Sequence, residues 1–78
     1  MRNLSNVTIA EFRAIMSLLG LTKVRTKGGH EAWMKAGMTR PAIVQTHVDP
    51  VPEYVLRNNL RAIGISKEDF LALLDNQK

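Results

Sequence analysis

The stretch LTKVRTKGGHEAWMKA, residues 21–36, contains the strongest structural signals in the chain. In residues 21–27, cationic side chains alternate with threonine and valine, which is the two-residue period of a β-strand. The pair Gly28-Gly29 that follows is typical of a hairpin turn. The alternation predicts a strand that carries three cations on one face, namely Lys23, Arg25 and Lys27.

A second strand is predicted after this turn, over residues 30–36. In it, Ala32 and Met34 share the side of His30, whereas Trp33 faces the opposite side. Another turn is predicted over 37–41, and a third strand over 42–48, where β-branched residues are frequent. Tight turns join these strands, so we expect one three-stranded antiparallel sheet.

A helix precedes the predicted sheet. Thr8 and Glu11 have the spacing of a capping box, and apolar residues then recur at helical intervals over residues 9–19. Gly20 ends this helix in the position that glycine commonly takes after a last helical turn.

Two more helices are predicted after the sheet. The first starts near a proline-rich breaker, residues 49–52, with Pro52 or Glu53 in its first turn, and ends at Gly64. Ser66 caps the second, and residues 76–78 are expected to fray.

The predicted order is α, β, β, β, α, α, which makes the chain an α+β protein. Its 78 residues form one domain, 1–78. An antiparallel sheet of this kind packs helices on one face and leaves the other face exposed.

Charge is the most informative feature of the composition. Eleven Lys and Arg residues against seven Asp and Glu residues give a formal net charge of +4. A small basic domain often meets a polyanion, although net charge also keeps proteins in solution. The bases concentrate in the strand region and the helix after it, while three of the seven acids lie between residues 68 and 75. This asymmetry favours a binding face.

Several classes of protein are disfavoured by the composition. Without cysteine there is no disulfide or thiolate metal site. The two histidines and the scattered carboxylates lack any recognised ligand spacing, so we expect no metal and no cofactor. No apolar run approaches the roughly 20 residues that cross a bilayer, and the first residues do not resemble a signal peptide. A cytoplasmic protein without a membrane partner is expected.

The run Thr26-Lys27-Gly28-Gly29-His30 resembles the lysine–glycine–serine–histidine signature of HicA toxins. Downstream, Thr46-His47, a proline-bearing stretch and residues 56–66 resemble the closing strand, loop and helix of that family. The resemblance covers about residues 8–66, and its strength lies in the ordered set of motifs.

The resemblance implies a fold and a function. HicA toxins are small proteins with a double-stranded-RNA-binding-like fold that degrade messenger RNA and are inhibited by a HicB antitoxin. It therefore implies a metal-independent endoribonuclease, an mRNA interferase of a type II toxin–antitoxin system, with mRNA and a HicB-type antitoxin as partners. The catalytic histidine of the family follows the glycine–serine turn and corresponds to His30. Gly29 stands where the family usually has serine, so either glycine serves the turn alone or the hydroxyl's role is missing.

The chemistry of RNA cleavage suits a histidine at this position. The ribose 2′-hydroxyl acts as internal nucleophile and must lose a proton, which imidazole accepts near neutral pH. Arg25 and Lys27 are candidates to stabilise the charge that develops on the phosphate. His47 is a candidate second proton carrier, although its interpretation as a strand-end residue that supports the next loop is favoured.

Further residues are candidates for RNA contact. The glycine pair, Gly28 and Gly29, forms a turn first and offers close backbone approach to phosphate second. Trp33 either stacks on a base or is buried. The remaining candidates for phosphate contact are Lys23, Arg25 and Lys27 in the first strand, and Arg57 and Arg61, one helical turn apart.

Two other functions remain open at this point. The chain could be a non-catalytic RNA-binding domain in which His30 contacts phosphate or caps a turn. It could also be a protein-interaction module whose basic face meets acidic partners.

Overall fold

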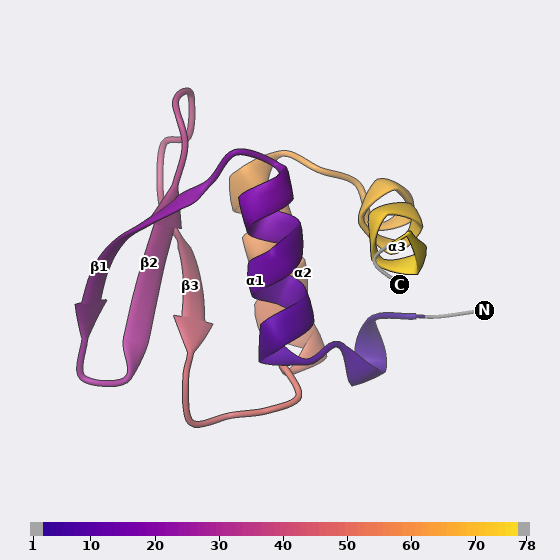
Figure 1. Ribbon diagram of the computed structural model, residues 1–78, viewed down its shortest axis with the longest axis horizontal. Helices are drawn as coiled ribbons and strands as arrows, with labels where there is room; N and C mark the ends of the chain where they lie inside the picture. Colours follow the sequence, from indigo (N-terminus) through magenta and orange to yellow (C-terminus); the bar gives the residue numbers. More distant parts are fainter. Residues whose placement is uncertain (1–2, 77–78) are drawn as a thin grey trace.

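A three-stranded sheet and three α-helices make up residues 3–76, the part of the chain described by the computed structural model (Figure 1). The elements are η1 Leu4–Asn6, α1 Ile9–Leu18, β1 Thr22–Lys27, β2 His30–Met34, β3 Ala42–Gln45, α2 Glu53–Ile63 and α3 Lys67–Asp75. The predicted α+β class and the order α-β-β-β-α-α are confirmed. The short 3-10 helix η1 was not predicted.

The strands form one antiparallel sheet in the order β1-β2-β3. The predicted hairpin turn is confirmed, since Gly28 and Gly29 both adopt left-handed backbone angles, with φ of 57° and 83°. β2 and β3 are shorter than predicted. β3 ends at Gln45 because the chain turns there, and the N–H of Val48 donates to the Gln45 carbonyl at 3.2 Å.

A β-bulge in β1 changes which side chains share a face. Lys23 pairs with Trp33, but the next pair joins Arg25 to the preceding residue of β2, so Val24 is the extra residue. Paired residues of an antiparallel sheet point to the same side. Lys23 therefore lies on the face of Trp33, whereas Arg25 and Lys27 lie on the opposite face. The prediction that all three cations share one face is wrong, because a regular alternation cannot reveal a bulge.

The predicted helix caps are confirmed. Thr8 and Glu11 form a reciprocal capping box, in which the Glu11 N–H donates to Thr8 Oγ1 at 3.1 Å and the Thr8 N–H donates to Glu11 Oε1 at 2.9 Å. Ser66 Oγ accepts from the Asp69 N–H at 3.0 Å. Gly64 ends α2 in the left-handed conformation. These local signals fix helix ends independently of tertiary packing.

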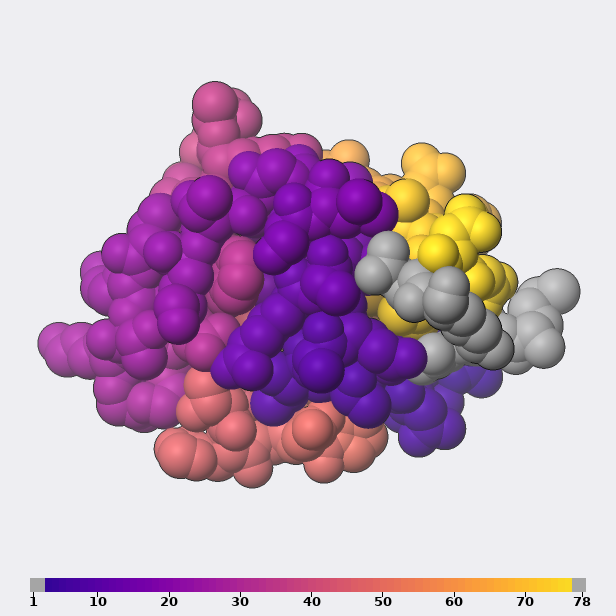
Figure 2. All heavy atoms as spheres, viewed as in Figure 1, coloured from indigo at the N-terminus to yellow at the C-terminus, as the bar shows by residue number. Residues whose placement is uncertain are grey.

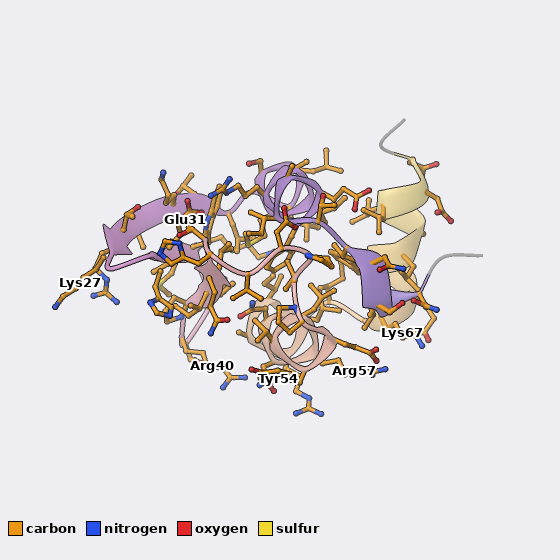
Figure 3. All side chains as sticks on the ribbon, turned by 90° about the horizontal axis from the view of Figure 1, so that it is seen from below. Lys27, Glu31, Arg40, Tyr54, Arg57 and Lys67 are labelled. Atoms are coloured by element: carbon orange, nitrogen blue, oxygen red, sulfur yellow. The ribbon has the colours of Figure 1, made fainter. Side chains whose placement is uncertain are left out.

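The core lies between the sheet and α3. Helices α1 and α2 cover one face of the sheet, and α3 packs on the far side of these two helices (Figures 1 and 3). Phe12 of α1 and Phe70 of α3 meet edge to face, with ring centroids 6.1 Å apart. In the space-filling view, α1 lies between the sheet and α3, and the β2–β3 connection projects at the top (Figure 2).

The free edge of β3 is tied to α2 by one buried side chain. The Asn59 amide donates to the Ile43 carbonyl at 2.7 Å, and its oxygen accepts from the Ile43 N–H at 2.9 Å. This pair of bonds takes the place of a neighbouring strand, because the amide satisfies both backbone groups of Ile43. It fixes α2 beside the edge of the sheet.

Two terminal features complete the fold. The Asn76 N–H donates to the Leu73 carbonyl at 3.1 Å at the end of α3. Residues 77 and 78, which were also expected to fray, lie outside the described residues. Among residues 3–76, no helix combines the length and the apolar character needed to cross a membrane.

Candidate functional site

The open face of the sheet carries a basic hollow. The hollow has a volume of about 310 Å³ and is lined by Arg25, Lys27, His30, Ala32 and Ile43. Two cations and one imidazole thus surround it, and none of the lining residues is acidic. The structure brings together three of the residues predicted from the sequence, Arg25, Lys27 and His30.

His30 is exposed at the first position of β2, where Lys27 is its partner on β1 and Gln45 its partner on β3. Its side of the sheet is the one that α1 and α2 do not cover. The imidazole is therefore accessible and lies beside cations, as a general base for RNA would need. Ala32 shares its face and Trp33 lies on the opposite one, as predicted.

Gly29 leaves room for the ring of His47. A Cβ built on Gly29 would lie 2.7 Å from His47 Cδ2 and closer still to Nε2, so a side chain there would have to displace the exposed His47 ring. Its φ of 83° also disfavours any residue other than glycine. Glycine is thus favoured at position 29 chiefly by the backbone conformation, and also by the space that the His47 ring occupies.

Thr46 holds His47 against the turn. Both its N–H and its hydroxyl donate to the Gly29 carbonyl, at 2.8 and 3.0 Å. Nothing in the sequence places His47 near His30, yet the structure packs it on the residue just before His30. The β2–β3 register explains this, since pairing His30 with Gln45 sets residues 46 and 47 beside 29 and 28. The register itself is not readable from the sequence.

Trp33 belongs to the core. Only 8% of the residue is exposed, and its indole N–H donates to Glu31 Oε1 at 3.1 Å. The base-stacking alternative for Trp33 is therefore wrong, and the burial alternative is confirmed. A large aromatic ring facing the helices contributes most to stability when it is buried with its N–H satisfied.

Glu31, which sequence reasoning did not single out, is a buried acid next to His30. Arg13 of α1 donates to it from Nε at 3.1 Å and from Nη2 at 2.6 Å. These bonds lower the pKa of Glu31, the Trp33 N–H and the charge of Lys23 act in the same direction, and burial opposes them. The cluster fastens β2 to α1 and so holds the backbone that presents His30.

Lys23 does not line the hollow. The bulge places it on the helix-covered side of the sheet, where its charge acts on Glu31. Its predicted role as a phosphate contact beside Arg25 and Lys27 is therefore not supported by its position.

Arg57 and Arg61 lie apart from the hollow. Both are exposed on α2 and line a separate depression with Leu4 and Lys67. Arg57 is also held by Glu53, which accepts from Nε and Nη2 at 3.0 and 2.7 Å. The structure does not bring these two arginines together with His30.

No group of three or more His, Cys, Asp or Glu side chains is placed to hold a metal ion within residues 3–76. Comparisons with protein-family models, with curated proteins and with solved structures give no match.

Proposed function

We propose that this protein is an RNA-cleaving toxin of the HicA type, an mRNA interferase with a double-stranded-RNA-binding-like fold. The observation that carries the proposal is the position of His30. Its imidazole lies on an open sheet face in a hollow that it shares with Arg25 and Lys27. A proton acceptor beside two cations is what cleavage of a phosphodiester by its own 2′-hydroxyl requires.

In the proposed reaction His30 removes the proton of the 2′-hydroxyl. The 2′-oxygen then bonds to the adjacent phosphorus while the bond from phosphorus to the 5′-oxygen breaks. The products are a 2′,3′-cyclic phosphate and a 5′-hydroxyl, which takes up one proton. Arg25 and Lys27 stabilise the negative charge on the non-bridging phosphate oxygens. A positioned base of this kind contributes roughly 10²- to 10⁴-fold to the rate.

His47 is the candidate to deliver that proton to the leaving oxygen. Its ring packs on Gly29, the residue directly before His30. This arrangement gives Gly29 a function of its own, so that the absence of the family's serine does not argue against activity.

The proposed substrate is messenger RNA in the cytoplasm, and the proposed partner is a HicB-type antitoxin. A free ribonuclease would damage its own cell, which makes an inhibitor necessary. An inhibitor that covers His30 and offers carboxylates to Arg25 and Lys27 would match the charge of this face.

The test is cleavage of end-labelled, unstructured RNA by the purified protein beside its His30→Ala variant, with a metal chelator present. We expect cleavage products ending in a cyclic phosphate from the parent and none from the variant, while both bind RNA. Binding without cleavage by either protein would indicate a non-catalytic RNA-binding domain. Absence of binding at low salt would leave a protein-interaction module, since phosphate contacts strengthen as salt falls.

A further inference from the structure

A second, larger groove adjoins the hollow of His30 along the edge of β3. It has a volume of about 460 Å³ and lies between β3 and α2. Ile43 lines both the groove and the hollow. Gln45 lines the groove and is the strand partner of His30, so the two sites are parts of one surface.

The walls of the groove combine an aromatic ring, a cation and amides. Tyr54 of α2 is 68% exposed, so its ring is accessible to a ligand. Arg40 reaches across from the β2–β3 connection, where its Nη2 donates weakly to the Asn58 carbonyl at 3.4 Å. Figure 3 shows Arg40 and Tyr54 on the same side of the molecule.

The polar groups of the groove are available to a ligand. Within the described part of the chain, the side-chain amides of Gln45 and Asn58 have no protein hydrogen-bond partner, in contrast to that of Asn59. None of the residues lining the groove is acidic. The volume lies in the range of roughly 300–1,000 Å³ that is usual for small-molecule sites.

We propose that this groove binds an unpaired nucleobase of the RNA whose backbone crosses the His30 hollow. Tyr54 stacks on the base, the amides of Gln45 and Asn58 bond to its edge, and Arg40 contacts a flanking phosphate. Aromatic stacking combined with amide contacts to base edges is how proteins recognise single-stranded RNA. The inference rests on the proposed RNA substrate and specifies it as single-stranded, with one base held next to the cleaved phosphate.

The experiment measures binding of a fluorescent, unstructured RNA of about 12 nucleotides, within the 4–16 that single-strand sites commonly cover. The His30→Ala protein is used throughout, so that the RNA stays intact. Tyr54→Leu is compared with Tyr54→Phe, which keeps the stacking ring. Lys67→Ala removes a cation at the other end of the molecule and serves as the control (Figure 3).

We expect Tyr54→Leu to weaken binding about tenfold, within the range of roughly 5- to 150-fold that stacking of one base gives. The salt dependence of RNA binding by Tyr54→Leu should equal that of the parent. Arg40→Ala should instead reduce the slope of log affinity against log salt concentration by about 0.7. Tyr54→Phe and Lys67→Ala should stay within about twofold of the parent. An RNA of the same length with abasic sites should bind the parent and Tyr54→Leu equally weakly.

Two results would overturn the base-binding groove while leaving the proposed cleavage intact. One is unchanged binding by Tyr54→Leu when Arg25→Ala weakens it. The other is that Tyr54→Leu weakens binding of a fully paired duplex as much as it weakens binding of single-stranded RNA, since the bases of a duplex cannot enter the groove. If neither single-stranded nor duplex RNA binds at low salt and the parent cleaves no RNA, the proposed function fails together with the groove.

Discussion

The imidazole of His47 occupies the space that a Cβ atom on residue 29 would need. Gly29 and His47 come from different strand ends, and the two hydrogen bonds from Thr46 to the Gly29 carbonyl keep them in contact. The turn that presents His30 is therefore supported from β3 as well as from its own glycines. Substitutions at position 29 should report on this contact.

Gly29→Ala should destabilise the protein by more than Gly28→Ala. Both glycines have positive φ, which costs other residues roughly 1–2 kcal/mol, but only the Cβ at position 29 meets another side chain. Displacing the His47 ring should add only about 0.5 kcal/mol, because that ring is exposed and can move. The free energy of unfolding in urea measures both variants.

The contact can be isolated by repeating Gly29→Ala in a His47→Ala background. There the added methyl group meets no ring, so its cost should fall to that of Gly28→Ala. An unchanged penalty in the double variant would show that backbone strain alone accounts for the glycine.

Stability should fall in acid through Glu31. Its pKa is lowered in the folded protein, chiefly by the hydrogen bonds from Arg13, relative to its ordinary value of 4.5. The stabilisation is therefore complete above about pH 4.5 and is lost as the pH falls through the lower folded pKa. Glu31→Gln should cost about 1–2 kcal/mol at neutral pH, and this difference should shrink in acid.

Glu53→Gln provides the matched control for the acid series. Glu53 also pairs with an arginine, Arg57, but both side chains are about half exposed. Its loss should change the free energy of unfolding by less than about 0.5 kcal/mol at neutral pH. Equal effects at Glu31 and Glu53 in urea unfolding would contradict the structural role given to the partly buried pair of Arg13 and Glu31.

Asn59→Leu should destabilise the fold much more than Asn58→Ala. Asn59 is buried and bonds both backbone groups of Ile43, whereas Asn58 is exposed. Leaving those groups unsatisfied should cost about 2–4 kcal/mol, against less than about 0.5 for the exposed neighbour. Thermal and urea unfolding measure the difference, and amide exchange at Ile43 should quicken in the Asn59 variant.

Local signals predicted most of the fold, and long-range geometry accounts for what they missed. The capping box at Thr8, the glycine turn and the cap at Ser66 each act over a few residues, so the sequence predicts them directly. The bulge at Val24 and the early end of β3 depend on how the strands pair. No periodicity in one strand can reveal such pairing.

In the candidate site, too, local sequence signals predicted some features, whereas others depend on long-range geometry. The basic strand and the turn before His30 were predicted, and the structure places Arg25, Lys27 and His30 around one hollow. The contact between His47 and Gly29 depends on the β2–β3 register, and the groove of Tyr54 on the position of α2. The burial of Trp33 depends on which face the helices cover.

The bulge leads to a last prediction, which separates three cations that look equivalent in the sequence. If the proposed function holds, Arg25→Ala and Lys27→Ala should each slow RNA cleavage about tenfold or more, because each removes a proposed phosphate contact. Each should also reduce the slope of log affinity against log salt concentration by about 0.7. Lys23→Ala should leave both nearly unchanged, because Lys23 lies on the other face of the sheet. Cleavage rates at several salt concentrations measure all three variants. Equal losses from all three would mean that overall charge, and not the arrangement of the open face, governs the reaction.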